Sequence, residues 1–198
     1  MLYWLGKTLF HIYFRLFHRI EVSGLDRLPP RPFILASNHS SLLDPPLVGS
    51  SLPFNIYYMA KEELFKIPVF GSVIRKVHAF PIKRGATDVS AIRNALNVLE
   101  NKNALLMFPE GTRKKKGRAL KGISFVAHKS GLPVLCVRII GNDSIRMFSK
   151  LRLVIGPVKM FPETPEEKAE AGTYQTFAEE IVKTIYSIEI EPCNGLLR

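Results

Sequence analysis

Residues 33–48 read FILASNHSSLLDPPLV, in which a short apolar run passes directly into polar residues. The run Phe33–Ala36 is typical of a strand buried on both faces, because every one of its side chains is apolar. Residues 37–39 follow at once, so the strand delivers polar groups to its carboxyl end. Asp44 stands before Pro45, the pattern of a helix N-cap with proline in the first turn, and a helix is expected from there. A buried strand, a polar loop and a helix in this order indicate an α/β domain.

Strands and helices alternate along the rest of the chain. Short apolar runs predict strands, and apolar residues spaced three or four apart predict helices. Strands are expected at 55–60, 80–82, 104–108, 134–140 and 151–155, and helices within 61–75 and over 88–99, 122–129 and 177–188. The alternation predicts an α/β fold: a layered domain with a mostly parallel or mixed central sheet flanked by helices, preceded by an N-terminal amphipathic helix.

The composition fits one globular domain with a surplus of positive charge. The chain has 198 residues, 46% of them hydrophobic, which is enough to bury a core and excludes a disordered tail. Its two cysteines are too few for a disulfide scaffold. The formal net charge of +11 predicts a negatively charged partner: nucleic acid, an anionic membrane surface or a phosphorylated substrate. A dense run of cations lies between Arg113 and Lys121.

Residues 1–20 are expected to form the amphipathic helix. Lys7, His11 and Arg15 recur at helical spacing and form a cationic stripe, while large apolar side chains occupy the other faces. This arrangement suits the plane of a membrane interface, with aromatic rings near headgroup depth; the alternative is a helix packed on its own domain. The apolar runs fall short of the roughly 18 residues that span a bilayer. The side chains expected to face the membrane are Trp4, Phe10, Phe14 and Phe17.

Three of the expected strands end in loops that carry reactive or charged side chains. These loops are residues 38–44, 83–85 and 108–113. In sheets of this kind, ligands bind outside the carboxyl ends of the strands. We therefore expect the three loops to converge on one site.

His39 and Asp44 lie too far round an unbroken helix to meet, but a turn followed by a helix start brings the carboxylate to the imidazole. The pair then has the chemistry of a general base and its orienting group, and an ordinary histidine pKa of about 6.5 suits proton abstraction from a hydroxyl. The sequence has no G-x-S-x-G elbow of a serine hydrolase and no H-E-x-x-H metal motif. The activated hydroxyl is therefore expected to belong to a substrate, which favours group transfer without a bound metal.

The segment 108–113, FPEGTR, admits two interpretations from its residues alone. Gly111 permits close backbone approach, and Arg113 with the pair 83–84 supplies cations, so the turn is suited to cradle a phosphate. In the other interpretation, Glu110 and Arg113 form a salt bridge that only holds the turn in shape.

These motifs resemble the glycerolipid acyltransferase family, most closely its bacterial lysophosphatidic acid acyltransferases. Residues 38–44 match the NHxxxxD motif of the family, residues 79–85 match its second block, and residues 108–113 contain its FPEGTR block in full. The similarity extends from Pro32 to Pro157.

The resemblance implies an O-acyltransferase of phospholipid biosynthesis. His39 is then the general base that deprotonates the sn-2 hydroxyl of 1-acyl-sn-glycerol 3-phosphate, and Asp44 orients it. The oxygen attacks the thioester of acyl-CoA or acyl-acyl-carrier-protein and gives phosphatidic acid, with no cofactor. Glycerol 3-phosphate or a lyso-aminolipid as acceptor fits the same chemistry. A non-enzymatic protein that binds anionic lipid or nucleic acid is a further alternative, although no nucleic-acid-binding motif is present.

The resemblance also implies binding roles and a location. The residues expected to bind the substrate phosphate are Lys61, Arg84, Gly111, Thr112 and Arg113, and those expected to shape the loop are Pro109 and Glu110. Residues 21–198 are the expected catalytic domain and residues 1–20 the membrane-interface helix. The protein is then peripheral or monotopic on the cytoplasmic face of a bacterial membrane, with an anionic membrane surface and not nucleic acid as its partner.

Two positions depart from the family pattern. His78 stands where glycine is usual, a change expected to alter the shape of the pocket. Cys136 stands where a second proline is usual, which is expected to affect only the local geometry of a strand end.

Overall fold

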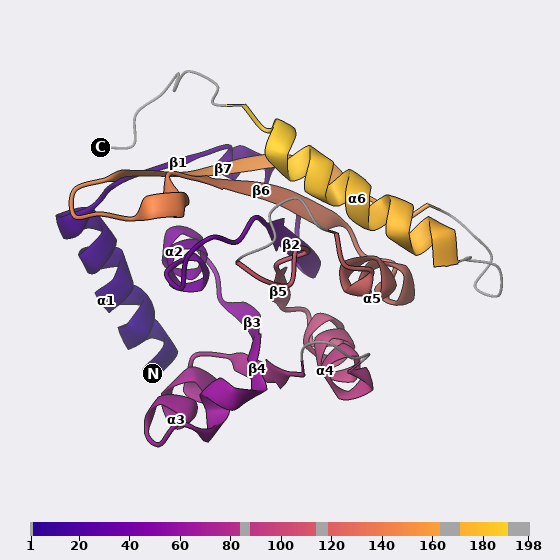
Figure 1. Cartoon of the computed structure of the whole chain (residues 1–198), viewed down its shortest axis with the longest axis horizontal. Helices are drawn as coiled ribbons and strands as arrows, with labels where there is room; N and C mark the ends of the chain where they lie inside the picture. The colour runs from indigo at the N-terminus through magenta and orange to yellow at the C-terminus, as the bar shows by residue number, and fades with distance from the viewer. Residues whose placement is uncertain (1, 84–87, 114–118, 163–170, 190–198) are drawn as a thin grey trace.

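The computed structural model describes residues 2–83, 88–113, 119–162 and 171–189 (Figure 1). Within these ranges one sheet has the strand order β1-β7-β6-β2-β5-β3-β4. The strands are β1 (Arg19–Ser23), β2 (Phe33–Ser37), β3 (Ile56–Lys61), β4 (Ala79–Ile82), β5 (Ala104–Met107), β6 (Val134–Ile140) and β7 (Lys150–Lys159). Of the pairs in this sheet, β6 and β7 are antiparallel and all others are parallel. The predicted α/β fold with a mostly parallel, mixed sheet is confirmed.

Helices cover both faces of the sheet. They are α1 (Leu2–Phe17), α2 (Asp44–Ser51), α3 (Phe70–Lys76), α4 (Val89–Glu100), α5 (Gly122–Ser130) and α6 (Ala171–Ser187), with short 3-10 turns at Leu25–Arg27, Glu62–Lys66 and Asn142–Ser144. One local prediction needs correction: Asp44 is the first residue of α2 and not its cap, because Leu43 occupies the cap position. The buried face of α4 is formed by Ala91, Ala95, Val98 and Leu99.

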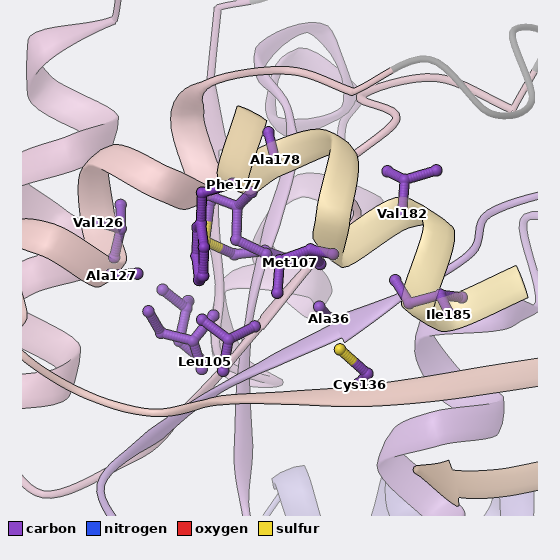
Figure 2. Packing of buried hydrophobic residues seen from close by; sticks show 14 of the residues in the cluster. Ala36, Leu105, Met107, Val126, Ala127, Cys136, Phe177, Ala178, Val182 and Ile185 are labelled. Atoms are coloured by element: carbon purple, nitrogen blue, oxygen red, sulfur yellow. The ribbon is translucent and has the colours of Figure 1, made fainter. Parts of the chain in front are cut away.

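The strand β2 divides the core into two layers, as its apolar sequence predicted. Phe33 and Leu35 pack with α1 and α2 on one face of the sheet. Ile34 and Ala36 pack with α4, α5 and α6 on the other face. Figure 2 shows the second cluster, in which α6 covers the sheet. Cys136 is one of its buried members, and burial raises the pKa of its thiol to about 12, so this cysteine behaves as a small apolar residue.

The position of the site follows from the connections that leave β2 and β5. These strands are parallel neighbours, so their carboxyl ends lie side by side. The chain leaves β2 towards α2 on one face of the sheet and leaves β5 towards α5 on the other. A point where two adjacent loops part in this way is the usual position of a ligand in an open α/β sheet.

The helix α1 packs on the domain, and two residues of its polar stripe contact the end of α2. The Lys7 ammonium donates hydrogen bonds to the carbonyl oxygens of Leu52 (2.5 Å) and Phe54 (3.0 Å), at the end of α2. His11 Nδ1 lies 3.3 Å from the carbonyl oxygen of Ser50 in the last turn of α2. A cation is favoured at a helix C-terminus, where carbonyl groups lack helical partners. Partial burial lowers the pKa of Lys7.

The expectation that Phe14 faces the membrane is wrong. Phe14 is fully buried and packs with Phe33 and Leu47 in the layer below α1. The other three aromatic residues of that prediction, Trp4, Phe10 and Phe17, are exposed. Exposed apolar side chains also lie along the helix at Leu2, Leu5, Leu9, Ile12 and Leu16. Among the described helices, none is both long enough and apolar enough to cross a membrane.

The packing of Phe14 makes a prediction about stability. Phe14→Ala should lower the free energy of unfolding by about 3–5 kcal/mol, because it opens a cavity in a closed core. Leu9→Ala on the exposed side of the same helix should change it by less than about 0.5 kcal/mol. Urea unfolding of both variants measures the difference. Equal, small effects would show that α1 is not part of the core.

Candidate active site

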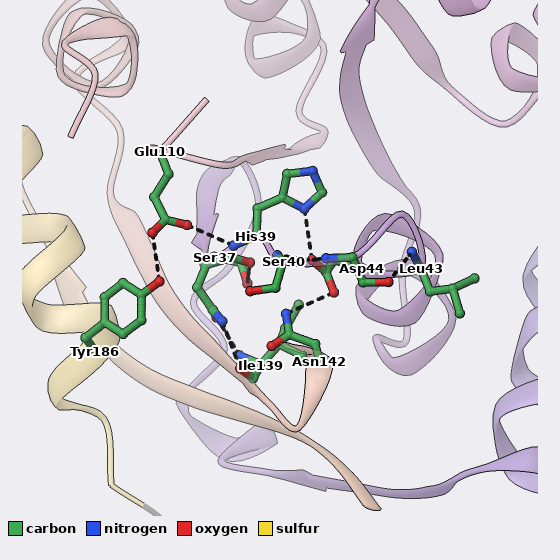
Figure 3. A network of polar contacts seen from close by, with 11 residues as sticks. Ser37, His39, Ser40, Leu43, Asp44, Glu110, Ile139, Asn142 and Tyr186 are labelled. Atoms are coloured by element: carbon green, nitrogen blue, oxygen red, sulfur yellow. Dashed lines mark hydrogen bonds and ion pairs between the residues drawn. The ribbon is translucent and has the colours of Figure 1, made fainter. Parts of the chain in front are cut away.

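Asp44 is completely buried beside His39, and its carboxylate is the centre of a polar network (Figure 3). Oδ2 lies 2.9 Å from His39 Nδ1 and accepts hydrogen bonds from the backbone N–H groups of Ser40 (2.7 Å) and Ser41 (2.8 Å). Oδ1 accepts from the Asn142 side chain at 3.0 Å. A buried carboxylate is tolerated only when such donors surround it. The turn over residues 40–43 thus makes the predicted contact between the carboxylate and the imidazole.

His39 is held by the strands on both sides of β2. Its backbone N–H donates to Glu110 Oε2 at 3.0 Å, and its ring stacks on Phe108 with a centroid distance of 4.1 Å. The preceding residue, Asn38, donates from Nδ2 to the carbonyl oxygen of Ile139 (2.9 Å) and accepts at Oδ1 from its N–H (2.7 Å). The Asn38 side chain therefore continues the pairing of β2 with β6 one residue beyond the strand. These contacts fix the backbone that presents the imidazole.

Glu110 joins the loop after β5 to two other segments. Its side chain is buried; besides His39 N–H, it accepts a hydrogen bond from the Tyr186 hydroxyl of α6 at 2.7 Å (Figure 3). Burial and the bond to Glu110 raise the pKa of Tyr186. Arg138 Nη1 donates to the carbonyl oxygens of Tyr186 and Ile188, each at 2.8 Å, and ties the end of α6 to β6. Glu110 thus anchors the loop inward, to the histidine backbone and to α6.

Some of the residues expected to bind phosphate lie at neighbouring strand ends. Lys61 ends β3, is half exposed, and forms an ion pair of 2.9 Å with Glu63. Thr112 is half-buried and Arg113 exposed in the loop after β5. Arg84 lies outside the described residues, and so do residues 114–118 of the basic run between Arg113 and Lys121.

Gly111 and Pro109 shape the turn after β5. Gly111 has a φ of +64°, a backbone conformation that favours glycine, and a side chain there would have to displace the end of the Leu120 side chain. Its N–H donates to the carbonyl oxygen of Phe108 at 2.9 Å and closes the turn. Pro109 is buried, and its carbonyl oxygen accepts from Leu120 N–H at 2.9 Å. The contribution of Gly111 is therefore the turn itself, since its N–H is already engaged.

A sequence profile of the acyltransferase family matches residues 19–140, which is over half of the chain and includes the three loops predicted from the sequence. The chain belongs to the acyltransferase family. The 1-acyl-sn-glycerol-3-phosphate acyltransferase of Bacillus subtilis is 32% identical over 143 residues, covering 69% of this chain and 72% of that protein. The enzyme of the same name from Streptococcus pneumoniae is 38% identical over 125 residues, covering 61% of this chain and 47% of that protein.

A solved structure supports the same relationship. The fold is similar to the crystal structure of the 1-acyl-sn-glycerophosphate acyltransferase PlsC from Thermotoga maritima, with a TM-score of 0.64 and 30% identity. That similarity covers 92% of this chain and 75% of the other. It therefore includes elements outside residues 19–140.

Two residues of this acyltransferase site were missed by the sequence analysis. Asn142 follows β6, whose carboxyl end lies beside that of β2, so the rule that identified the other loops applied to it as well. Tyr186 gave no comparable signal, because one aromatic residue in an amphipathic helix is ordinarily a packing residue. Its role depends on where α6 crosses the sheet.

His78 departs from the family pattern at a place remote from the site. It precedes β4, at the amino end of the sheet, whereas His39 follows the carboxyl end of β2. Its φ of +69° explains why glycine is usual there. The imidazole stacks between Tyr3 of α1 (4.3 Å) and Tyr57 of β3 (4.5 Å). His78 therefore supports the seating of α1, and its effect on the shape of the pocket stays a prediction.

Asp88 pins both ends of the segment that contains Arg84. Its carboxylate accepts from Lys83 N–H (2.7 Å) at the end of β4, and from the Ser90 hydroxyl (2.6 Å) and Ala91 N–H (3.0 Å) in α4. These hydrogen bonds lower the pKa of Asp88 to about 2. The ends of the loop are thereby held although the carboxylate is close to solvent.

Asp88→Ala should destabilise the protein by about 1 kcal/mol at pH 7, as the loss of a helix cap does. Because the pKa of Asp88 is depressed in the folded state, its contribution is complete above about pH 4 and is lost as the pH falls towards 2. The difference between variant and parent should therefore shrink in that window. Urea unfolding at several pH values measures it, and a difference that persists at low pH would contradict the assignment.

Tyr186→Phe removes a hydrogen bond to a buried carboxylate and should cost about 1–2 kcal/mol of unfolding free energy. Tyr57→Phe is a matched control, because the Tyr57 hydroxyl makes no hydrogen bond with the described residues. Urea unfolding compares the two variants. If both behaved alike, the bond between Tyr186 and Glu110 would not contribute to the fold.

Proposed function

We propose that this acyltransferase transfers an acyl chain from acyl-CoA or acyl-acyl-carrier-protein to the sn-2 hydroxyl of 1-acyl-sn-glycerol 3-phosphate, giving phosphatidic acid. The proposal is carried by the buried contact of 2.9 Å between His39 Nδ1 and Asp44 Oδ2 at the carboxyl end of β2. The names of the relatives support this acceptor.

His39 acts as the general base. Asp44 engages Nδ1 and holds it in the protonated tautomer, so Nε2 carries the lone pair that accepts the proton of the sn-2 hydroxyl. The alkoxide oxygen attacks the thioester carbonyl carbon, and the tetrahedral intermediate collapses by breaking the C–S bond. The proton on His39 then passes to the departing thiolate. The products are an ester and a thiol, the histidine is regenerated, and no cofactor is needed.

Asp44 stabilises the positive charge that forms on the ring. Its carboxylate cannot turn away, because Ser40 N–H, Ser41 N–H and Asn142 also bind it. Stacking on Phe108 restricts the imidazole as well. A base fixed in this way loses little free energy to reorganisation during the reaction.

The phosphate of the acceptor would bind beside this pair. Arg113, Thr112 and Lys61 lie at the ends of β5 and β3, and Arg84 follows β4 in the sequence. An Arg guanidinium binds phosphate oxygens in pairs, whereas Lys61 supplies a point charge. Gly111 gives the turn its shape and Glu110 anchors it.

The exposed side of α1 would contact the membrane. Trp4, Phe10 and Phe17 are exposed on this helix, as are Leu5, Leu9 and Leu16. A helix whose apolar side is unpartnered suits an interfacial position, here the cytoplasmic face of a bacterial membrane. The acceptor is itself a lipid of that surface.

His39→Ala and Asp44→Asn should each lower acyl transfer to 1-acyl-sn-glycerol 3-phosphate by about 10²–10⁴-fold. His11→Ala is the matched control, because His11 is an exposed residue of α1 that contacts the end of α2 and not His39 or Asp44, and this variant should retain activity. A labelled acyl group is supplied on CoA and on carrier protein, with detergent-dispersed acceptor. Full activity of His39→Ala would refute the mechanism.

The same assay identifies the acceptor. Glycerol 3-phosphate and a lyso-aminolipid are offered beside 1-acyl-sn-glycerol 3-phosphate, and the last should be acylated fastest. Faster acylation of either alternative would refute the proposed acceptor and leave the acyl-transfer chemistry in place.

A further inference from the structure

The connection between β6 and β7 carries two large apolar side chains into solvent. Met147 is 67% exposed and Phe148 is 64% exposed. Phe148 also has a φ of +63°, a backbone conformation that bulky L-residues rarely adopt. An exposed aromatic ring therefore stands at a position where glycine or asparagine would fit the backbone better.

Met147 and Phe148 form the tip of this connection, and the segments on both sides of the tip are held in place. Towards β6, Asn142 is bound to Asp44 and Ile145 packs against the core. Towards β7, Ser149 N–H donates to the carbonyl oxygen of Arg146 at 3.0 Å, and Ser149 Oγ lies 3.3 Å from His18 Nδ1. The exposure of Met147 and Phe148 is thus a feature of an ordered turn.

The tip adjoins the exposed side of α1. Phe148 N–H donates to the carbonyl oxygen of Phe17, the last residue of α1, at 2.7 Å. Leu16 and Phe17 are both exposed there, so the apolar surface of the helix continues onto the tip. Figure 1 shows this connection beside the end of α1 that leads into β1.

Exposed cations lie in the segments that meet where the tip joins the end of α1. Arg15, Arg19 and Arg146 are exposed there, and Asp143 is the acidic residue of the connection. Lys150 and Arg152 are compensated by Glu21, at 2.7 Å and 2.8 Å. An apolar surface bordered by arginines complements anionic headgroups above acyl chains.

We propose that Met147 and Phe148 insert into an anionic lipid bilayer beside α1, as a second membrane contact of this acyltransferase. The occupant is a lipid surface because the tip continues the apolar side of α1 and its border is cationic. The proposal builds on the membrane location proposed above and is independent of the acceptor. Insertion into lipid explains why phenylalanine occupies a position with a positive φ, because glycine would fit the backbone but would place no apolar side chain in the bilayer.

Phe148→Gly separates binding from folding. Glycine adopts a positive φ freely, so this variant should unfold at the same temperature as the parent or higher. Its affinity for vesicles of phosphatidylcholine and phosphatidylglycerol should nevertheless fall several-fold. With Met147→Ser added, the loss should reach about tenfold, because two apolar side chains no longer leave water.

Met160→Ser is the matched control. Met160 is 56% exposed and follows the far end of β7, roughly 30 Å from the tip at the usual rise of a strand. Its vesicle affinity should equal that of the parent. Affinities of the double tip variant and the control that agree within about twofold would overturn the proposal.

A single tryptophan at the tip reports its position directly. Trp4 is the sole tryptophan of the chain, so Trp4→Phe with Phe148→Trp leaves one reporter. Its emission should shift to shorter wavelength on vesicles and be quenched by brominated phosphatidylcholine. A bound protein with an unquenched reporter would overturn the proposal.

Sedimentation without lipid tests the alternative that Met147 and Phe148 contact a second copy of the chain. The parent and Phe148→Gly should sediment alike. A dimer that Phe148→Gly dissociates would overturn the proposal in favour of a protein contact. These measurements contain no acyl donor. A negative result in them would therefore not contradict the proposed acyl transfer, and an inactive enzyme would not contradict the proposed membrane contact.

Discussion

The burial of one carboxylate governs the architecture of the site. Asp44 has no contact with solvent, and an ionised group in such a place is stable only while donors surround it. Those donors come from the turn that follows β2, from His39, and from Asn142 after β6. The need to satisfy Asp44 therefore fixes the shape of the turn, the orientation of the imidazole and the path of the chain between β6 and β7.

The orientation of α1 follows from a different balance. Sequence periodicity correctly separates a cationic stripe from apolar sides, but it does not say which side meets the domain. The free carbonyl groups at the end of α2 attract Lys7, and a gap in the core accepts Phe14. Both are long-range features that appear only once α2 and the sheet are in place. Leu5, Leu9, Ile12 and Leu16 are left outward, whereas an ordinary surface helix turns polar residues to the solvent.

The sequence was sufficient for the features that depend on local pattern. The run at residues 33–36 predicted a two-sided buried strand, and the loops after β2 and β5 lie at adjacent strand ends as expected. The partners of Glu110 could not be predicted, because its neighbour in sequence, Arg113, offers an obvious salt bridge. The fold instead brings His39 N–H and Tyr186 to it, from segments far away along the chain. These hydrogen bonds are made inside the protein, where they contribute more to stability than an ion pair exposed to solvent.

The connection between β6 and β7 links the proposed catalytic pair to the proposed membrane contact. Asn142 at its start binds Asp44, and Phe148 near its end is joined to the last residue of α1. Because Ile145 is packed between them, the connection has little freedom to bend. A bilayer that bound the tip and α1 as proposed would therefore set the height of His39 above the lipid surface. An acceptor whose acyl chain stays in the bilayer can present its sn-2 hydroxyl only within a narrow range of heights, so the rigidity of this short connection is what would match the enzyme to its substrate.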